Sequence, residues 1–152
     1  MIKICKTICY AAEQLKLMDA ANVRFGFDVI YKDVDNVYLT EERIQELYEY
    51  DLSSRPAWEK VKDVFVVGCL TGQRVSDYKR INAKMIVTLT DGNKYVKLKQ
   101  EKTGNIVYIP LDYRVAAILD KYNGTLPKVY DQKINDHIKE IGEVLGLSLI
   151  HI

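Results

Sequence analysis

An apolar segment from Val61 to Leu70 is the feature that most constrains how this chain folds. Its apolar residues recur at helical spacing and form one broad face, which predicts a helix at the centre of the core. Pro56 suits the first turn of this helix, and Thr71-Gly72 is a typical helix stop. Ser76-Asp77 then predicts the start of a second helix, because both side chains can cap backbone N–H groups. Arg74 is therefore expected on a short connection between two helices.

Periodicity and capping residues predict further helices over about residues 4–15, 41–48, 77–83, 113–122 and 131–145. Between these helices, three segments have strand character: 85–89, 95–99 and 106–111. Turn signals such as Asp91-Gly92 separate them. Val96 and Leu98 are expected to face inward, and Lys97 and Lys99 outward. The predicted fold class is α+β, mainly helical with a small three-stranded antiparallel sheet.

The composition indicates a folded protein outside the membrane. The chain has 152 residues, of which 48% are hydrophobic, enough for one domain with a real core. The longest apolar run, Val64 to Leu70, is too short to span a bilayer, and the N-terminus lacks the pattern of a signal peptide. Three cysteines do not form a disulfide framework, and Cys5 and Cys9 lack nearby partner ligands for a metal. We therefore expect a cytoplasmic protein without a metal or cofactor, in which these cysteines serve packing.

The charge distribution singles out the middle of the chain. The net charge of +1 predicts no nucleic-acid partner by itself. Residues 55–102, however, hold 11 Lys/Arg against 5 Asp/Glu, whereas the rest holds 11 against 16. This asymmetry is compatible with a surface that binds a polyanion. Solvated lysines on strand edges would produce the same asymmetry.

Arg74 is the strongest candidate for chemistry. A planar guanidinium that is always charged, placed beside a helix N-terminus, suits a phosphate that gains charge during reaction. The alternative is that Arg74 pairs with Asp77 or another surface carboxylate.

A family resemblance rests on two motifs and their order. Thr71-Gly72-Gln73-Arg74-Val75-Ser76-Asp77 follows the apolar helix, and Lys102-Thr103-Gly104 lies at the second turn of the predicted sheet, before Ile109-Pro110-Leu111. In this order the chain resembles the catalytic domain of tyrosine recombinases, the phage-integrase family, particularly integrases of the Bacteroides type. The resemblance covers roughly residues 36–147. It implies a remnant of the last core-binding helix over 1–20, a linker over 21–38, and the N-terminal part of a catalytic domain over 39–152.

The resemblance implies site-specific DNA recombination, by strand cleavage and rejoining through a 3′-phosphotyrosine. Arg74 matches the arginine that binds the scissile phosphate, and Lys102 the hairpin lysine that acts as general acid on the departing 5′ oxygen. Asp77 matches a supporting acidic position, although a plain helix cap is an equal alternative. Contacts to the DNA backbone are expected from a further set, Gln73, Lys97, Lys99 and Thr103. The implied partner is double-stranded DNA, bound by an oligomer of the full-length protein from a bacterium, phage or mobile element.

The chain also departs from the family pattern. The His-x-x-Arg box and the late tyrosine nucleophile are missing, because His151 is followed only by Ile152 and the last tyrosine is Tyr130. We therefore expect a fold that is incomplete at the C-terminus, and a chain that does not cleave DNA by itself. We also expect an exposed apolar face built by Val61, Phe65 and Ile138. Two other hypotheses stay open: a non-catalytic DNA-binding module, and an unrelated α/β interaction domain with a chance Thr-Gly-x-Arg turn.

Overall fold

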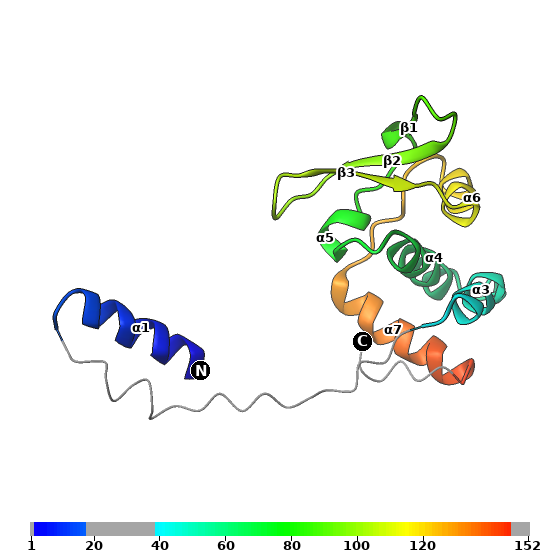
Figure 1. The fold of residues 1–152 in the computed structure, drawn as a ribbon. Coiled ribbons are helices and arrows are strands. Elements are labelled where there is room, and N and C mark those ends of the chain that lie inside the picture. The colour runs from blue at the N-terminus through cyan, green and yellow to red at the C-terminus, as the bar shows by residue number, and fades with distance from the viewer. Residues whose placement is uncertain (1, 18–38, 147–152) are drawn as a thin grey trace. The chain divides into compact units, whose positions relative to one another are not determined.

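The computed structural model describes residues 2–17 and 39–146 (Figure 1). The chain divides into two units, Met1–Asp35 and Asn36–Ile152, which are described separately. In the first unit, α1 (Ile2–Gln14) confirms the helix predicted near the N-terminus. Its side chains Ile4, Ile8 and Leu15 are exposed. The predicted linker at 21–38 and the segment 147–152 with His151 lie outside the described residues.

The second unit has the predicted α+β class. Its helices are α3 (Glu41–Glu49), α4 (Pro56–Thr71), α5 (Val75–Tyr78), the 3₁₀-helix η1 (Ala83–Met85), α6 (Tyr113–Lys121) and α7 (Asp131–Val144). Its strands are β1 (Ile86–Thr88), β2 (Lys94–Lys99) and β3 (Ile106–Pro110). They form one antiparallel sheet in the order β1-β2-β3, as predicted.

Helix α4 forms the centre of this unit and packs against α3, α5, α6 and α7 (Figure 1). Pro56 occupies its first turn, and Gly72 ends it with a φ of 63°, a left-handed conformation that favours glycine. Val61, Val64, Val66 and Val67 are all buried, so the helix buries more than the single face that its periodicity predicted. This is the geometry expected of a helix enclosed by neighbours.

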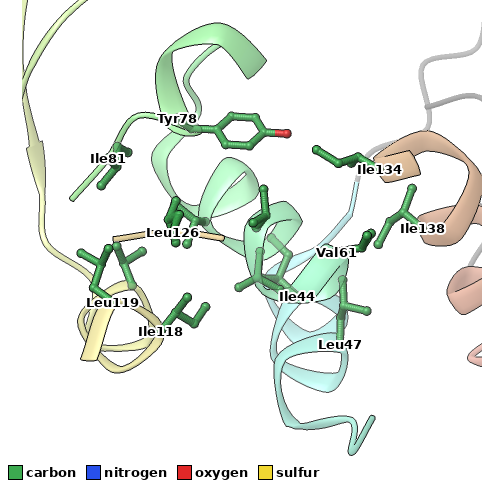
Figure 2. Close-up of a cluster of buried hydrophobic side chains, with 14 of the residues drawn as sticks. Ile44, Leu47, Val61, Tyr78, Ile81, Ile118, Leu119, Leu126, Ile134 and Ile138 are labelled. Carbon is green, nitrogen blue, oxygen red and sulfur yellow. The ribbon is translucent and has the colours of Figure 1, made fainter. Parts of the chain in front are cut away.

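The predicted exposed apolar face is not found. Val61 and Ile138 are 1% and 0% exposed, and Phe65 is partly buried. The reason is that α7 packs along α4, so that Ile134 and Ile138 cover Val61 (Figure 2). The prediction was wrong because it assumed that helices beyond residue 146 are needed to cover this face of α4.

The sheet has one buried face and one exposed face. Val96 pairs with Ile109 across β2 and β3, and both are buried together with Leu98. Lys97 and Lys99 alternate with these residues and are exposed, which confirms the predicted orientation. The exposed face therefore presents two lysines beside the hairpin that joins β2 and β3.

Two charged residues of α4 are buried and tie it to its neighbours. Lys62 Nζ donates hydrogen bonds to the carbonyls of Tyr48 and Tyr50 at the end of α3, at 3.0 and 2.8 Å. Asp63 Oδ2 accepts from Lys121 Nζ and the Tyr122 hydroxyl of the α6 end, at 2.6 and 2.8 Å. Burial lowers the pKa of Lys62, although its contact with Asp63 acts in the opposite direction. These bonds satisfy polar groups that would be costly to bury alone.

Candidate functional site

Arg74 lies where α4 ends and α5 begins. It occupies the N-cap position of α5 in an extended conformation, with φ −67° and ψ 154°. The helix predicted over 77–83 is wrong: α5 starts at Val75, ends at Tyr78, and is followed by a turn. Ser76 and Asp77 lie inside α5, and so do not cap it. Farther along, Asn82 is extended and its side chain accepts a hydrogen bond from the Lys84 N–H, which starts η1 in place of a longer helix.

Asp77 joins the Arg74 connection to the β2–β3 hairpin. Its side chain is 0% exposed, and its Oδ1 accepts from the Glu101 N–H at 2.8 Å and from Arg80 Nη2 at 2.8 Å. Arg80 Nη2 also donates to the Lys99 carbonyl at 2.9 Å. The Glu101 N–H holds the pKa of the Asp77 carboxyl below its ordinary value, with further contributions from the charges of Arg80 and Arg74.

The ion pair at Asp77 is formed by Arg80 and not by Arg74, which was the alternative considered from the sequence. Arg80 lies three residues along the chain from Asp77. Within the described part of the chain, the Arg74 side chain forms no hydrogen bond or ion pair, and it is exposed. Its guanidinium is therefore available for an external anion.

A second set of hydrogen bonds connects the same two segments. Gln73 Oε1 accepts from Gln100 Nε2 at 2.9 Å, and the Thr103 hydroxyl donates to Gln100 Oε1 at 2.8 Å. Gln73 and Asp77, on either side of Arg74, thus contact Gln100 and Glu101, which directly precede Lys102. Lys102 is exposed in the turn and has no bonded partner among residues 2–17 and 39–146. We call Gln73, Arg74, Lys99, Lys102 and Thr103 the Arg74–Lys102 surface.

The remaining predicted residues lie on the exposed face of the sheet. Lys97 Nζ lies 5.8 Å from the centroid of the Tyr108 ring, a cation–π distance, and Tyr108 is 47% exposed. Lys99 is exposed one position from the hairpin turn. Sequence reasoning missed Tyr108, Arg80 and Gln100. The spacing of three residues between Asp77 and Arg80 is the one signal that could have indicated their pairing.

The residues next to Arg74 border a mainly apolar hollow of about 470 Å³ between α4, α5 and α7. Gln73, Val75, Cys69 and Tyr78 line it, but Arg74 does not. The Arg74 guanidinium therefore lies outside this hollow. Burial raises the pKa of Cys69 to about 11 and that of Tyr78 to about 12. Neither group is ionised near neutral pH, so neither is an activated nucleophile.

Comparisons with protein-family models, curated proteins and solved structures found no match for this chain. No group of three or more His, Cys, Asp or Glu side chains among the described residues is arranged to hold a metal. All three cysteines are free thiols, and Cys5 is exposed rather than packed as predicted. None of the helices in the described part of the chain has the length and apolar character needed to cross a membrane.

Proposed function

We propose that the Arg74–Lys102 surface binds the phosphate backbone of duplex DNA, and that the chain is part of the catalytic domain of a tyrosine recombinase. The observation that carries the proposal is the joining of two motifs that lie far apart in the sequence. Hydrogen bonds that Gln100 and Glu101 donate to Gln73 and Asp77 hold the Arg74 connection against the Lys102 turn. The two cations are left exposed and unpaired among the described residues.

This arrangement suits a phosphodiester. The fork of Arg74 can donate two hydrogen bonds to non-bridging oxygens, and an ammonium such as Lys102 can donate to a neighbouring oxygen. In phosphoryl transfer, cations held in place before the reaction stabilise the charge that develops on the phosphate. In the proposed recombinase, Lys102 also gives a proton to the departing 5′ oxygen. Asp77, Arg80 and Gln100 act as positioning residues.

The part of this function that belongs to residues 1–152 is DNA binding. Strand cleavage needs a nucleophile, and the resemblance places none among the tyrosines of this chain. The property to measure is therefore affinity for duplex DNA and its dependence on salt.

The first prediction concerns Arg74→Ala and Lys102→Ala. Each change removes one phosphate contact, so binding of a labelled duplex should weaken to a similar degree across unrelated sequences. The slope of log K against log salt, measured by fluorescence anisotropy between about 50 and 200 mM salt, should fall by about 0.9 for each lost contact. Arg74→Lys should lose part of the affinity but keep the slope, because the charge remains while the fork is lost.

Lys139→Ala is the matched control, since Lys139 is an exposed lysine of α7 with no bonded partner among the described residues. It should leave the affinity and slope unchanged. Duplex binding that is insensitive to salt and to Arg74→Ala would contradict the proposal. A complete lack of DNA affinity would favour the unrelated interaction domain.

A further inference from the structure

A second group of cations converges on a groove that shares no residue with the Arg74–Lys102 surface. The groove has a volume of about 260 Å³, and its lining includes Lys60, Lys128, Lys133, His137 and Tyr130. These residues come from three segments, namely α4, the segment before α7, and α7 itself. The fold therefore brings together lysines that are as many as 73 positions apart in the sequence. We call this the Tyr130 groove.

The charge of the Tyr130 groove is not balanced within the described residues. Lys60, Lys128 and Lys133 are exposed and form no hydrogen bond or ion pair there, and no carboxylate lines the groove. Along α7, Asp131 pairs with Lys79 and Asp136 accepts a hydrogen bond from Gln132 Nε2, whereas Glu140 contacts Nδ1 of the groove residue His137 at 3.1 Å. Three like charges around one concavity favour an anionic ligand with several charges.

The shape of the groove indicates an extended ligand. A second hollow of about 420 Å³ is lined by Lys79 and shares Lys128, Val129 and Tyr130 with the first. The segment 128–130 therefore forms a common wall between two hollows, and the unpaired Lys128 lines both of them. A chain of repeated anionic units could follow both hollows across this wall.

The ring of Tyr130 supplies the feature that distinguishes among anions. Tyr130 is 79% exposed, the most exposed aromatic side chain among the large hydrophobic residues of the described chain. Aromatic character continues beside the groove, where the Trp58 ring lies 6.1 Å from the His137 ring and carries the Arg55 guanidinium 4.4 Å from its centroid. Lysines interleaved with exposed rings are typical of surfaces that bind phosphates while bases stack on the rings.

We infer that the Tyr130 groove binds single-stranded nucleic acid, with a base stacked on Tyr130 and phosphates at Lys60, Lys128 and Lys133. A duplex fits less well, because its bases are already stacked and cannot reach the ring. This inference does not rest on the proposed function, since it uses neither Arg74 nor Lys102.

The test uses the whole 152-residue chain and a fluorescein-labelled oligothymidine of about twelve nucleotides. Tyr130→Ala should weaken binding by about 5- to 100-fold, the range for loss of one base–ring stack. Tyr130→Phe keeps the ring and should bind within about twofold of the original chain. The double change Lys128→Ala/Lys133→Ala should lower the salt slope by about 1.4, because each phosphate contact on a single strand contributes about 0.7.

Lys139→Ala is the control and should leave oligothymidine binding unchanged, whereas Arg74→Ala should weaken it less than Tyr130→Ala does. Melting temperatures should also stay the same, because the substituted side chains of the groove are exposed and unpaired in the described structure. The inference is overturned if the oligonucleotide does not bind, or if Arg74→Ala weakens binding while Tyr130→Ala does not. It is also overturned if polyglutamate of equal charge competes as well as the oligonucleotide. Failure of the proposed function would appear separately, in duplex binding that is unaffected by Arg74→Ala.

Discussion

Asp77 combines complete burial with a negative charge. One of its oxygens accepts from Glu101 and Arg80, whereas Oδ2 has no partner among the described residues. Such a group must stay ionised to hold two donors, one of them a backbone N–H of the hairpin turn. The geometry between the Arg74 connection and the Lys102 turn therefore depends on the charge of one carboxylate.

The pKa of Asp77 leads to a prediction about pH. Because the pKa is lowered in the folded state, Asp77 contributes stability that is fully present above the unfolded value of about 3.9. The contribution is lost as the pH falls through the lower, folded value. Asp77→Asn should therefore lower the melting temperature at about pH 7, and the difference from the original chain should shrink at about pH 3. Asp120→Asn, on the exposed side of α6, should show no such convergence. A difference that is equal at both pH values would show that charge is not the cause.

The sequence singled out Arg74 by its place between two predicted helices, and Lys102 only through the family resemblance. The hydrogen bonds that surround these two residues could not be predicted from the sequence. The bond between Asp77 and the Glu101 N–H and the bond between Gln73 and Gln100 join segments that meet only in the folded chain. Gln100 has no local signal in the sequence.

At the scale of elements, Gly68 of α4 lies directly against the Tyr78 ring of α5. A Cβ added there would lie 2.8 Å from Cε1 of the Tyr78 ring, closer than carbon atoms pack. Glycine is normally unfavourable inside a helix, so its presence here reflects this approach. In Figure 2 the Tyr78 ring extends from α5 toward Ile134 of α7, and Tyr78 is 6% exposed.

Gly68→Ala should therefore destabilise the protein by about 1–3 kcal/mol, although alanine is the better helix former. Denaturant unfolding measures the change. In a Tyr78→Leu background the same substitution should cost less, because the ring that causes the clash is gone. An equal cost in both backgrounds would place the strain elsewhere.

The ends of α4 and the buried and exposed positions of β2 were predictable, because Pro56, Gly72 and the alternation of Val96 with Lys97 are local signals. The length of α5 was not. Asp77 looks like a helix cap in the sequence, but its side chain bonds to the hairpin. The hydrogen bond between Asp77 and the hairpin therefore replaced the local preference of Asp77 for a helix-capping position.

At the scale of the molecule, every buried hydrophobic residue in the described chain lies between Ile44 and Ile141. The packing of α7 on α4 encloses the core in residues 39–146, which the sequence could not indicate because α7 has the same periodicity whether it packs or is exposed. The hydrophobic core of the described residues therefore lies in the second unit.

A fragment of residues 36–152 should fold and melt cooperatively, within about 4 °C of the full chain, a shift that corresponds to less than about 1 kcal/mol. Circular dichroism melting curves of the two proteins test this. Arg114→Ala provides a sensitive comparison, since Arg114 is buried and bonds Asp112, Gln45 and Glu41. It should lower the melting temperature of both proteins by a similar amount. A fragment that unfolds gradually would contradict the prediction.

The enclosure of α4 by four helices also has a consequence for the order in which the molecule opens. Backbone amides of Val64, Val66 and Val67 can exchange their hydrogens with solvent only when the surrounding helices separate, which requires the whole unit to unfold. Amides of the turn before Gly104 need only a local opening. Arg74 therefore follows the end of α4, the helix whose amide hydrogens should exchange most slowly. Lys102 lies in a turn that can open and close again while α4 remains folded.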